Sequence, residues 1–174
     1  VFVGISFACL CIAFLQDDFS VKVVASNSNS LLPPIYKFSA VWGNHEGSLL
    51  LWALILCVWT AAVAVFSGQL PLLVLSRVLA VMGAIGVGFI SFMLFTSNPF
   101  ERLLPGTPAD GNDLNPLLQD PGLIIHPPLL YLGFVGFIIP FAFAMSALAS
   151  GDLSSNWIKV SRRWTLIAWL FLSL

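Results

Sequence analysis

Charge is scarce in this chain. Only 9% of its 174 residues are charged, whereas 59% are hydrophobic. Soluble domains carry about 25% charged residues, so the composition excludes an ordinary soluble domain and predicts a polytopic helical membrane protein. The net charge of −1 also gives no reason to expect nucleic acid as a partner.

Ionisable groups are missing from the middles of the long apolar runs. Proton pumps, ion-coupled transporters and voltage sensors keep such groups along their path, so this absence argues against those classes. A channel or transporter half whose loops gate a pore stays open as an alternative. It predicts polar residues deep in the bilayer, and the runs offer only weak ones such as Thr60 and Ser91.

Sequence patterns of catalysis and of metal binding are missing too. The chain has no phosphate-binding glycine loop, no nucleophile elbow and no His-Glu-x-x-His pair. Its cysteines, Cys9, Cys11 and Cys57, lie inside apolar runs and lack the spacing of a zinc site. We interpret them as buried, unreactive thiols.

The apolar runs that are present predict an all-α bundle of membrane-spanning helices. These runs cover residues 1–15, 49–66, 77–96, 123–149 and 164–174. The first and last are shorter than the roughly 20 residues that a bilayer crossing requires. We therefore expect residues 1–174 to be one membrane domain of a longer protein, cut inside a helix at each end.

Alternate crossings place the connecting loops on two sides of the membrane. Two long polar loops, 16–48 and 97–122, share one side, and the short loops 67–76 and 150–163 share the other. Four basic residues lie in or at the edges of the short loops: Arg77, Lys159, Arg162 and Arg163. Because positive charge is denser there, the positive-inside rule predicts that the long loops are on the outer face.

Local patterns predict some structure within the long loops. Residues 21–25 are apolar and β-branched enough for a short strand, and Ser26–Ser30 has the composition of a turn. Pro33 and Pro34 disfavour a longer helix there. Ser48 is a plausible N-cap for the helix predicted from residue 49.

His126 is the first candidate for chemistry, because two prolines follow it. A residue before proline is pushed away from the helical region, so we expect His126 to be extended and Pro127 to open a helix. The positive end of that helix disfavours a cationic imidazole, which leaves a neutral ring able to bind a metal. Pro127 and Pro128 would hold this ring against the membrane edge.

His45 is the second candidate. It stands beside Glu46 just before a predicted helix, so capping and a local ion pair explain it as well as a binding role does. A hydrogen-bonding role without any ligand is the open alternative for both histidines. Three residues are candidates to accept a hydrogen bond that orients the His126 ring: Asp113, Asn115 and Asp120.

Three mixed-composition segments resemble one known family. They are Trp42-Gly-Asn-His-Glu-Gly-Ser-Leu-Leu-Leu-Trp52, Thr96-Ser-Asn-Pro-Phe-Glu-Arg-Leu-Leu-Pro105 and Asp113-Leu-Asn-Pro-Leu-Leu-Gln-Asp-Pro-Gly-Leu-Ile-Ile-His-Pro-Pro-Leu-Leu-Tyr131. Together with residues 27–30 and 77–83, they closely resemble CcmF, the haem lyase subunit of the multi-protein cytochrome c maturation system. The resemblance extends over essentially the whole chain.

This resemblance implies cytochrome c biogenesis in a bacterial or mitochondrial inner membrane. CcmF-like proteins take b-type haem from a haem chaperone at the outer face, together with other maturation subunits in the membrane. They promote its attachment to apocytochrome c, where it becomes c-type haem. His126 matches the first of two loop histidines that hold the haem iron, and His45 is a candidate for shaping the same surface.

The same resemblance also implies haem-binding segments and ligands that this sequence lacks. The family's tryptophan-rich WWD segment, its second loop histidine and its haem ligands within helices have no counterpart in this sequence. The chain would therefore supply one axial ligand of a pair, and whether it acts as an enzyme stays open. A membrane scaffold for an assembly complex, without haem ligation, is a further alternative.

Overall fold

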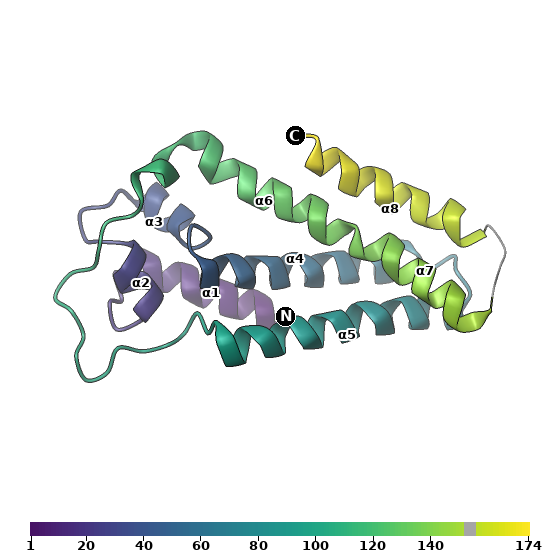
Figure 1. Ribbon diagram of the computed structural model, residues 1–174, viewed down its shortest axis with the longest axis horizontal. Helices are drawn as coiled ribbons and strands as arrows, with labels where there is room; N and C mark the ends of the chain where they lie inside the picture. The colour runs from purple at the N-terminus through teal and green to yellow at the C-terminus, as the bar shows by residue number, and fades with distance from the viewer. Residues whose placement is uncertain (152–155) are drawn as a thin grey trace. The chain divides into compact units, whose positions relative to one another are not determined.

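The computed structural model describes residues 1–151 and 156–174, which form helices joined by loops (Figure 1). The elements are α1 (Phe2–Leu15), α2 (Lys22–Asn27), α3 (Pro34–Ala40), α4 (His45–Phe66), α5 (Leu72–Thr96), the 3-10 helix η1 (Pro116–Gln119), α6 (Pro121–Gly136), α7 (Ile138–Ser150) and α8 (Asn156–Leu172). Within these ranges β-pairing is limited to a single bridge between Val21 and Arg102. The predicted all-α fold is confirmed.

Three stretches in the described ranges are long and apolar enough to cross a membrane: α4, α5 and the continuous segment Pro121–Ser150. α1 is apolar but shorter. α8 begins at Asn156, upstream of the predicted start at residue 164, because the basic connector itself is helical. Residues 152–155 of the predicted inner loop 150–163 lie outside the described residues.

The segment 121–150 is interrupted at Phe137, between α6 and α7. Pro140 has no N–H, so the carbonyl of Gly136 loses the helical donor that it would otherwise have. The N–H of Phe137 is shared between the carbonyls of Gly133, at 3.3 Å, and Phe134, at 3.2 Å. A proline three residues downstream is a sufficient cause for this break.

The chain divides into two compact units, which are best described separately. The loop-bearing unit comprises residues 1–54 and 91–127, and the helical unit comprises residues 55–90 and 128–174. The interpretation of residues 1–174 as one membrane domain stays a prediction.

In the loop-bearing unit the two long polar segments are hydrogen-bonded to each other. The N–H of Lys22 donates to the carbonyl of Glu101 and that of Leu103 to the carbonyl of Ser20, each over 2.8 Å. The N–H of Asn112 donates to the carbonyl of Ala25 over 2.7 Å. The same unit contains a core of buried apolar residues that includes Leu10, Phe14, Val24, Val41, Leu50 and Leu114.

Polar side chains add further bonds between these segments. Asp110 accepts from the N–H of Ser30 at 3.0 Å and from its hydroxyl at 2.8 Å. The ammonium of Lys37 lies 2.6 Å from both carboxylate oxygens of Asp17, and its side chain is only 8% exposed. Asp17 has a φ of 57°, a left-handed conformation that lets it end α1 and face Lys37.

The local predictions in this unit need two corrections. Residues 21–25 do not form a strand, because α2 covers Lys22–Asn27 and buries Val23, Val24 and Ala25. Ser48 is not an N-cap, because α4 already begins at His45. No longer helix forms at the prolines: α2 ends at Asn27, and the short α3 begins at Pro34, where proline is tolerated.

The cysteine prediction is correct only for Cys11, which is buried. Cys9 and Cys57 are exposed on the surfaces of their helices. An apolar helix in a membrane protein has no need to bury every apolar residue within its own chain, because lipid and other helices are apolar surroundings too.

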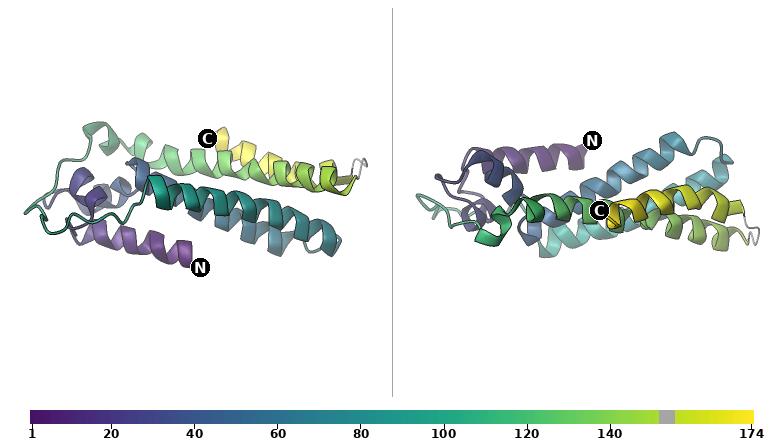
Figure 2. Two further views of the ribbon diagram at one scale, coloured as in Figure 1. Left: turned by 60° about the horizontal axis from the view of Figure 1, so that its bottom comes forward. Right: turned by 90° about the horizontal axis from the view of Figure 1, so that it is seen from above.

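In the helical unit α7 and α8 pack side by side, as both views of Figure 2 show. Gly133 and Gly136 allow the close approach of α8: an added Cβ would lie 2.4 Å from the Leu172 Cγ at the first position and 2.8 Å from the Ala168 Cβ at the second. The indole N–H of Trp59 donates to the carbonyl of Leu132 over 3.1 Å. These contacts join α4, α6, α7 and α8 within this unit.

Candidate functional site

His126 lies inside α6, so the predicted extended conformation is wrong. The helix begins five residues earlier, at Pro121, and the Asp120 carboxylate caps it by accepting from the N–H of Gly122 over 2.7 Å. The restriction that Pro127 places on the preceding residue is a preference of the isolated dipeptide. Here an upstream helix start overrides it.

Two consecutive prolines inside the helix leave two carbonyls without their helical donors. Pro127 cannot donate to the carbonyl of Leu123, and Pro128 cannot donate to that of Ile124. The indole N–H of Trp42 donates to the Ile124 carbonyl over 3.1 Å. A side chain from the segment before α4 thus replaces the missing backbone donor, and it fixes the turn of α6 that carries His126.

The His126 side chain is exposed, and the described part of the chain gives its imidazole no hydrogen-bond partner. The three residues predicted to orient it are bonded elsewhere. Asp113 accepts from the side-chain amide of Asn29. Asn115 caps η1 by accepting from the N–H of Leu117 at 3.1 Å, and Asp120 caps α6. Both ring nitrogens of His126 are therefore open to a ligand.

Exposed apolar side chains precede this imidazole along η1 and α6. Leu117, Leu123 and Ile125 are exposed by 70%, 40% and 59%. Leu123 and Ile125 lie within one helical turn of His126. An exposed imidazole flanked by exposed apolar side chains fits a flat apolar ligand that contains a metal, such as haem, because the imidazole supplies a nitrogen ligand and the apolar side chains supply contact area. The His126 imidazole could therefore fill one axial position of such a ligand.

His45 is the first residue of α4, and its Nδ1 lies 2.7 Å from the hydroxyl oxygen of Ser97 at the end of α5. The ion pair predicted with Glu46 is absent from the described residues, whose ion pairs are Lys22–Glu101, Lys37–Asp17 and Arg102–Asp18. When Nδ1 carries the proton and donates to Ser97, Nε2 keeps its lone pair for a ligand.

Residues 43–47, at the beginning of α4, are closely packed. A Cβ on Gly47 would lie 1.7 Å from the carbonyl oxygen of Val41, and one on Gly43 would lie 2.8 Å from the Leu118 Cδ1. Asn44 accepts from the N–H of Gly47 over 2.7 Å and donates to the carbonyl of Ala40 over 2.7 Å. Gly43, Asn44 and Gly47 therefore help to build the surface around His45.

The two histidines lie in the same unit, and Trp42 connects the beginnings of their two helices. They do not form a multidentate metal site: the described residues contain no group of three or more His, Cys, Asp or Glu side chains that could hold an ion. Sequence reasoning missed the role of Trp42. Two adjacent prolines were the available signal, because they require an outside donor for a helical carbonyl.

The family model described as cytochrome C assembly protein matches residues 42–174. The chain belongs to this family. It is 65% identical to the cytochrome c-type biogenesis protein CcmF of Pseudomonas aeruginosa and 59% identical to that of Escherichia coli, over 99% and 97% of the chain. The solved structure of a cytochrome c heme lyase CcmF matches 98% of the chain with a TM-score of 0.80 and 33% identity.

The chain spans 26% of the length of each of these relatives. The predicted resemblance to CcmF is confirmed, and so is cytochrome c biogenesis as the functional class, in preference to a channel or transporter half. The three long apolar helices make this member of the family a membrane protein.

Proposed function

We propose that this chain presents haem for cytochrome c biogenesis, with His126 as an axial ligand to the haem iron. One observation carries the proposal. An exposed imidazole without a partner in the described residues stands on a turn of α6 that Trp42 holds in place, near exposed apolar side chains. The related solved structure is that of a haem lyase, which gives the proposed ligand its chemical class.

Pro127 and Pro128 act by positioning. They remove two backbone donors from α6, and the Trp42 bond to Ile124 then ties the helix to the segment before α4. Because this bond already fixes the backbone turn that carries His126, less of the binding free energy is spent on ordering that turn when the ring binds iron. The second axial ligand would come from outside the residues of this chain.

His45 is the second candidate on this surface. Its Nδ1 contact with Ser97 orients the ring and leaves Nε2 for contact with haem or with the apocytochrome. The buried position of Ser97, which is 6% exposed, makes that orientation rigid.

The proposed setting is the outer face of an inner membrane, bacterial or mitochondrial, with residues 1–174 as one multi-pass membrane domain. Residues 55–90 and 128–174 contain Arg77, Lys159, Arg162 and Arg163 but a single acidic residue, Asp152. The positive-inside rule favours an inner position for their loops and an outer one for the long polar loops. A haem chaperone, apocytochrome c and other maturation subunits would meet the protein at the outer loops. The haem would arrive as b-type and leave as c-type.

The test uses the full-length protein with His126→Ala. Its co-purified haem, measured from the Soret band, and the yield of holocytochrome c should both fall. The thermal midpoint should stay unchanged, because the ring is exposed and has no partner in the described residues. His126→Gly with added imidazole should recover part of the Soret band, which a purely structural histidine would not do. Unchanged haem content and yield in His126→Ala would overturn the assignment.

A scaffold role without haem ligation is the second candidate, and the close packing of residues 42–47 favours it. Under that role His126→Ala would leave the Soret band of the full-length protein unchanged, and the Gly47 region would matter more than either histidine. The same optical spectra distinguish the two functions.

A further inference from the structure

A cavity of about 590 Å³ lies in the helical unit, at the end of α4 that is remote from His45. Its apolar wall begins at the buried indoles of Trp59 and Trp164, whose rings meet edge to face with centroids 6.1 Å apart. The wall continues to Phe66 and Ile167, which are 78% and 41% exposed. The cavity therefore runs from a buried aromatic pair to an exposed apolar surface.

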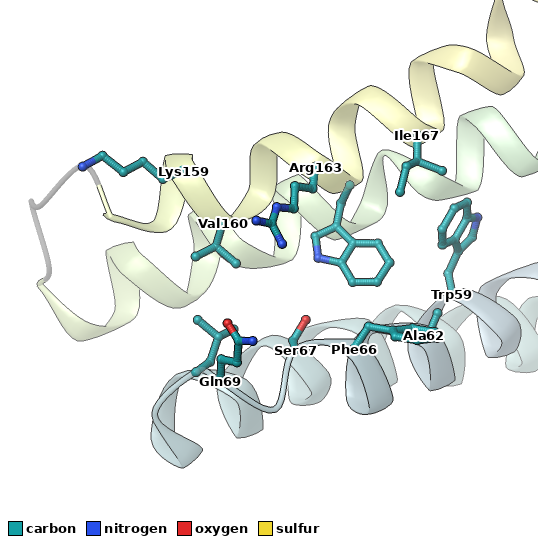
Figure 3. A pocket seen from close by; sticks show the side chains of 11 residues that line it. Trp59, Ala62, Phe66, Ser67, Gln69, Lys159, Val160, Arg163 and Ile167 are labelled. Atoms are coloured by element: carbon teal, nitrogen blue, oxygen red, sulfur yellow. The ribbon is translucent and has the colours of Figure 1, made fainter.

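The other lining of this cavity is polar and basic. Lys159 and Arg163 come from α8, and Ser67 and Gln69 come from the turn after α4. Figure 3 shows the Arg163 side chain extending from α8 toward the turn, with Ser67 and Gln69 directed back toward it. Lys159 and Arg163 are four residues apart, so they lie on one face of the helix.

The described residues of this unit offer these cations no acidic partner. The described residues within 55–90 and 128–174 include no Asp or Glu, and neither Lys159 nor Arg163 forms an ion pair among them. The cavity thus combines two basic side chains at one end with an aromatic and aliphatic wall at the other.

We propose that this cavity binds one anionic phospholipid. Its phosphodiester would lie against Arg163, and Ser67 and Gln69 would donate hydrogen bonds to its oxygens. The exposed Lys159 side chain, which points away from Arg163 in Figure 3, would turn toward the phosphodiester. An acyl chain would follow the wall from Trp59 to Ile167. This goes beyond haem handling and does not depend on it.

Charge and shape together select this ligand. A free phosphate ion would leave the apolar wall uncovered, and a lipid without net charge would bring no anion to the two basic side chains. Basic pockets between membrane helices on the cytoplasmic or matrix side bind anionic headgroups, and tryptophan is favoured at that depth. The volume is within the range of about 300–1,000 Å³ typical of ligand cavities.

The experiment measures lipid that stays bound to the full-length protein. The protein is reconstituted in nanodiscs of phosphatidylcholine with phosphatidylglycerol, released into mild detergent, and analysed by native mass spectrometry. Wild type should retain one phosphatidylglycerol. The double variant Lys159→Gln/Arg163→Gln should retain about tenfold less or lower still, because two charge-assisted contacts are lost.

Arg162→Gln is the control matched to the single variant Arg163→Gln, because each removes one positive charge and Arg162 does not line the cavity. Its retained lipid should equal that of wild type. Thermal midpoints show whether each variant is folded. If Arg163→Gln lowers the thermal midpoint, the retained lipid is compared between wild type and Lys159→Gln, because the Lys159 side chain is exposed and its loss should not affect folding.

Four outcomes would overturn the proposal. Equal loss in Arg162→Gln would show a general attraction to the charged surface. Equal retention of phosphatidylcholine would show no selection for the anionic headgroup. Displacement by millimolar glycerol 3-phosphate alone would show a site for soluble phosphate. Wild type without any bound lipid would show that another part of the longer protein fills the cavity.

Discussion

The indole N–H of Trp42 donates to the carbonyl of Ile124 over 3.1 Å, at the helix position where Pro128 provides no backbone donor. The bond joins the segment before α4 to the turn of α6 that carries His126. It explains how a helix tolerates two prolines beside an exposed candidate ligand. A buried carbonyl without a donor costs about 1–3 kcal/mol, so the bond also stabilises the loop-bearing unit.

Trp42→Phe keeps an aromatic ring and removes this donor. We expect the free energy of unfolding of the full-length protein to fall by about 1–2 kcal/mol, with a loss of co-purified haem as the His126 turn becomes less fixed. Thermal unfolding and the Soret band measure the two effects. Trp169→Phe is the control, since its side chain is 59% exposed. Equal behaviour of the two variants would contradict the positioning role of Trp42.

Gly47→Ala should destabilise the beginning of α4. The new Cβ would lie 1.7 Å from the Val41 carbonyl oxygen, so the backbone must shift, at a cost of about 1–3 kcal/mol. Gly106→Ala is the matched control in the same unit, because no atom lies within 4 Å of its added Cβ. A lower thermal midpoint is expected only for Gly47→Ala. If both variants unfold together, the close approach at Gly47 is not what constrains the residue.

Lys37→Met should be costly, because it leaves the Asp17 carboxylate beside an apolar side chain. The pair is largely buried, with side-chain exposures of 8% for Lys37 and 26% for Asp17, and breaking such a pair costs about 3 kcal/mol. Chemical denaturation of the full-length protein measures the loss.

Lys22→Met tests the same change at the surface. Lys22 and Glu101 are 50% and 58% exposed, so the expected cost is at most about 1 kcal/mol.

The double variant Asp17→Asn/Lys37→Met removes both charges of the buried pair. In chemical denaturation it should recover part of the stability that Lys37→Met loses. Similar losses for Lys22→Met and Lys37→Met would show that burial does not strengthen the Asp17 pair.

Acid should weaken the contacts between the two polar segments. Hydrogen bonds from the side chain and N–H of Ser20, together with Arg102, lower the pKa of Asp18 below its ordinary value. The N–H and hydroxyl of Ser30 and the N–H of Gly111 do the same for the pKa of Asp110. A lowered folded pKa means that the stabilisation is present above the ordinary carboxyl pKa of about 3.9 and is lost as the pH falls through the lower folded value.

Thermal midpoints measured at several pH values check this. At pH 7 the thermal midpoint of wild type should be higher than those of Asp18→Asn and Asp110→Asn. This difference in midpoint should shrink at pH values below about 4. A difference that stays constant with pH would show that the carboxylate charge is not the source of the stabilisation.

Local composition was sufficient for the broadest conclusions. Long uncharged runs can be stable only as helices with internally bonded backbones when they lie in lipid, so they predicted the all-α membrane fold without any tertiary knowledge. The mixed-composition segments around Trp42, Thr96 and His126 likewise carried the family resemblance, because polar loop residues are specified far more narrowly than apolar runs. The two prolines after His126 made it a candidate from sequence alone.

The short elements were decided by contacts between distant segments. Residues 21–25 have strand composition, yet burial of Val23 and Val24 in the core made them a helix. The conformation of His126 followed from the upstream start of α6, which the dipeptide rule for proline does not include. His45 contacts the hydroxyl of Ser97, 52 residues away, and does not pair with its neighbour Glu46.

The sequence by itself thus determined the helical membrane class, the family and the identity of the candidate ligand. Only the tertiary structure decided what holds that ligand, because the Trp42 donor and the Ile124 acceptor are 82 residues apart. The cavity between residues 59–70 and 159–167 likewise exists only because folding brings distant parts of the chain together. Backbone satisfaction and lipid burial act locally and can be read along the chain, whereas a specific donor or cavity exists only where folding brings remote residues together.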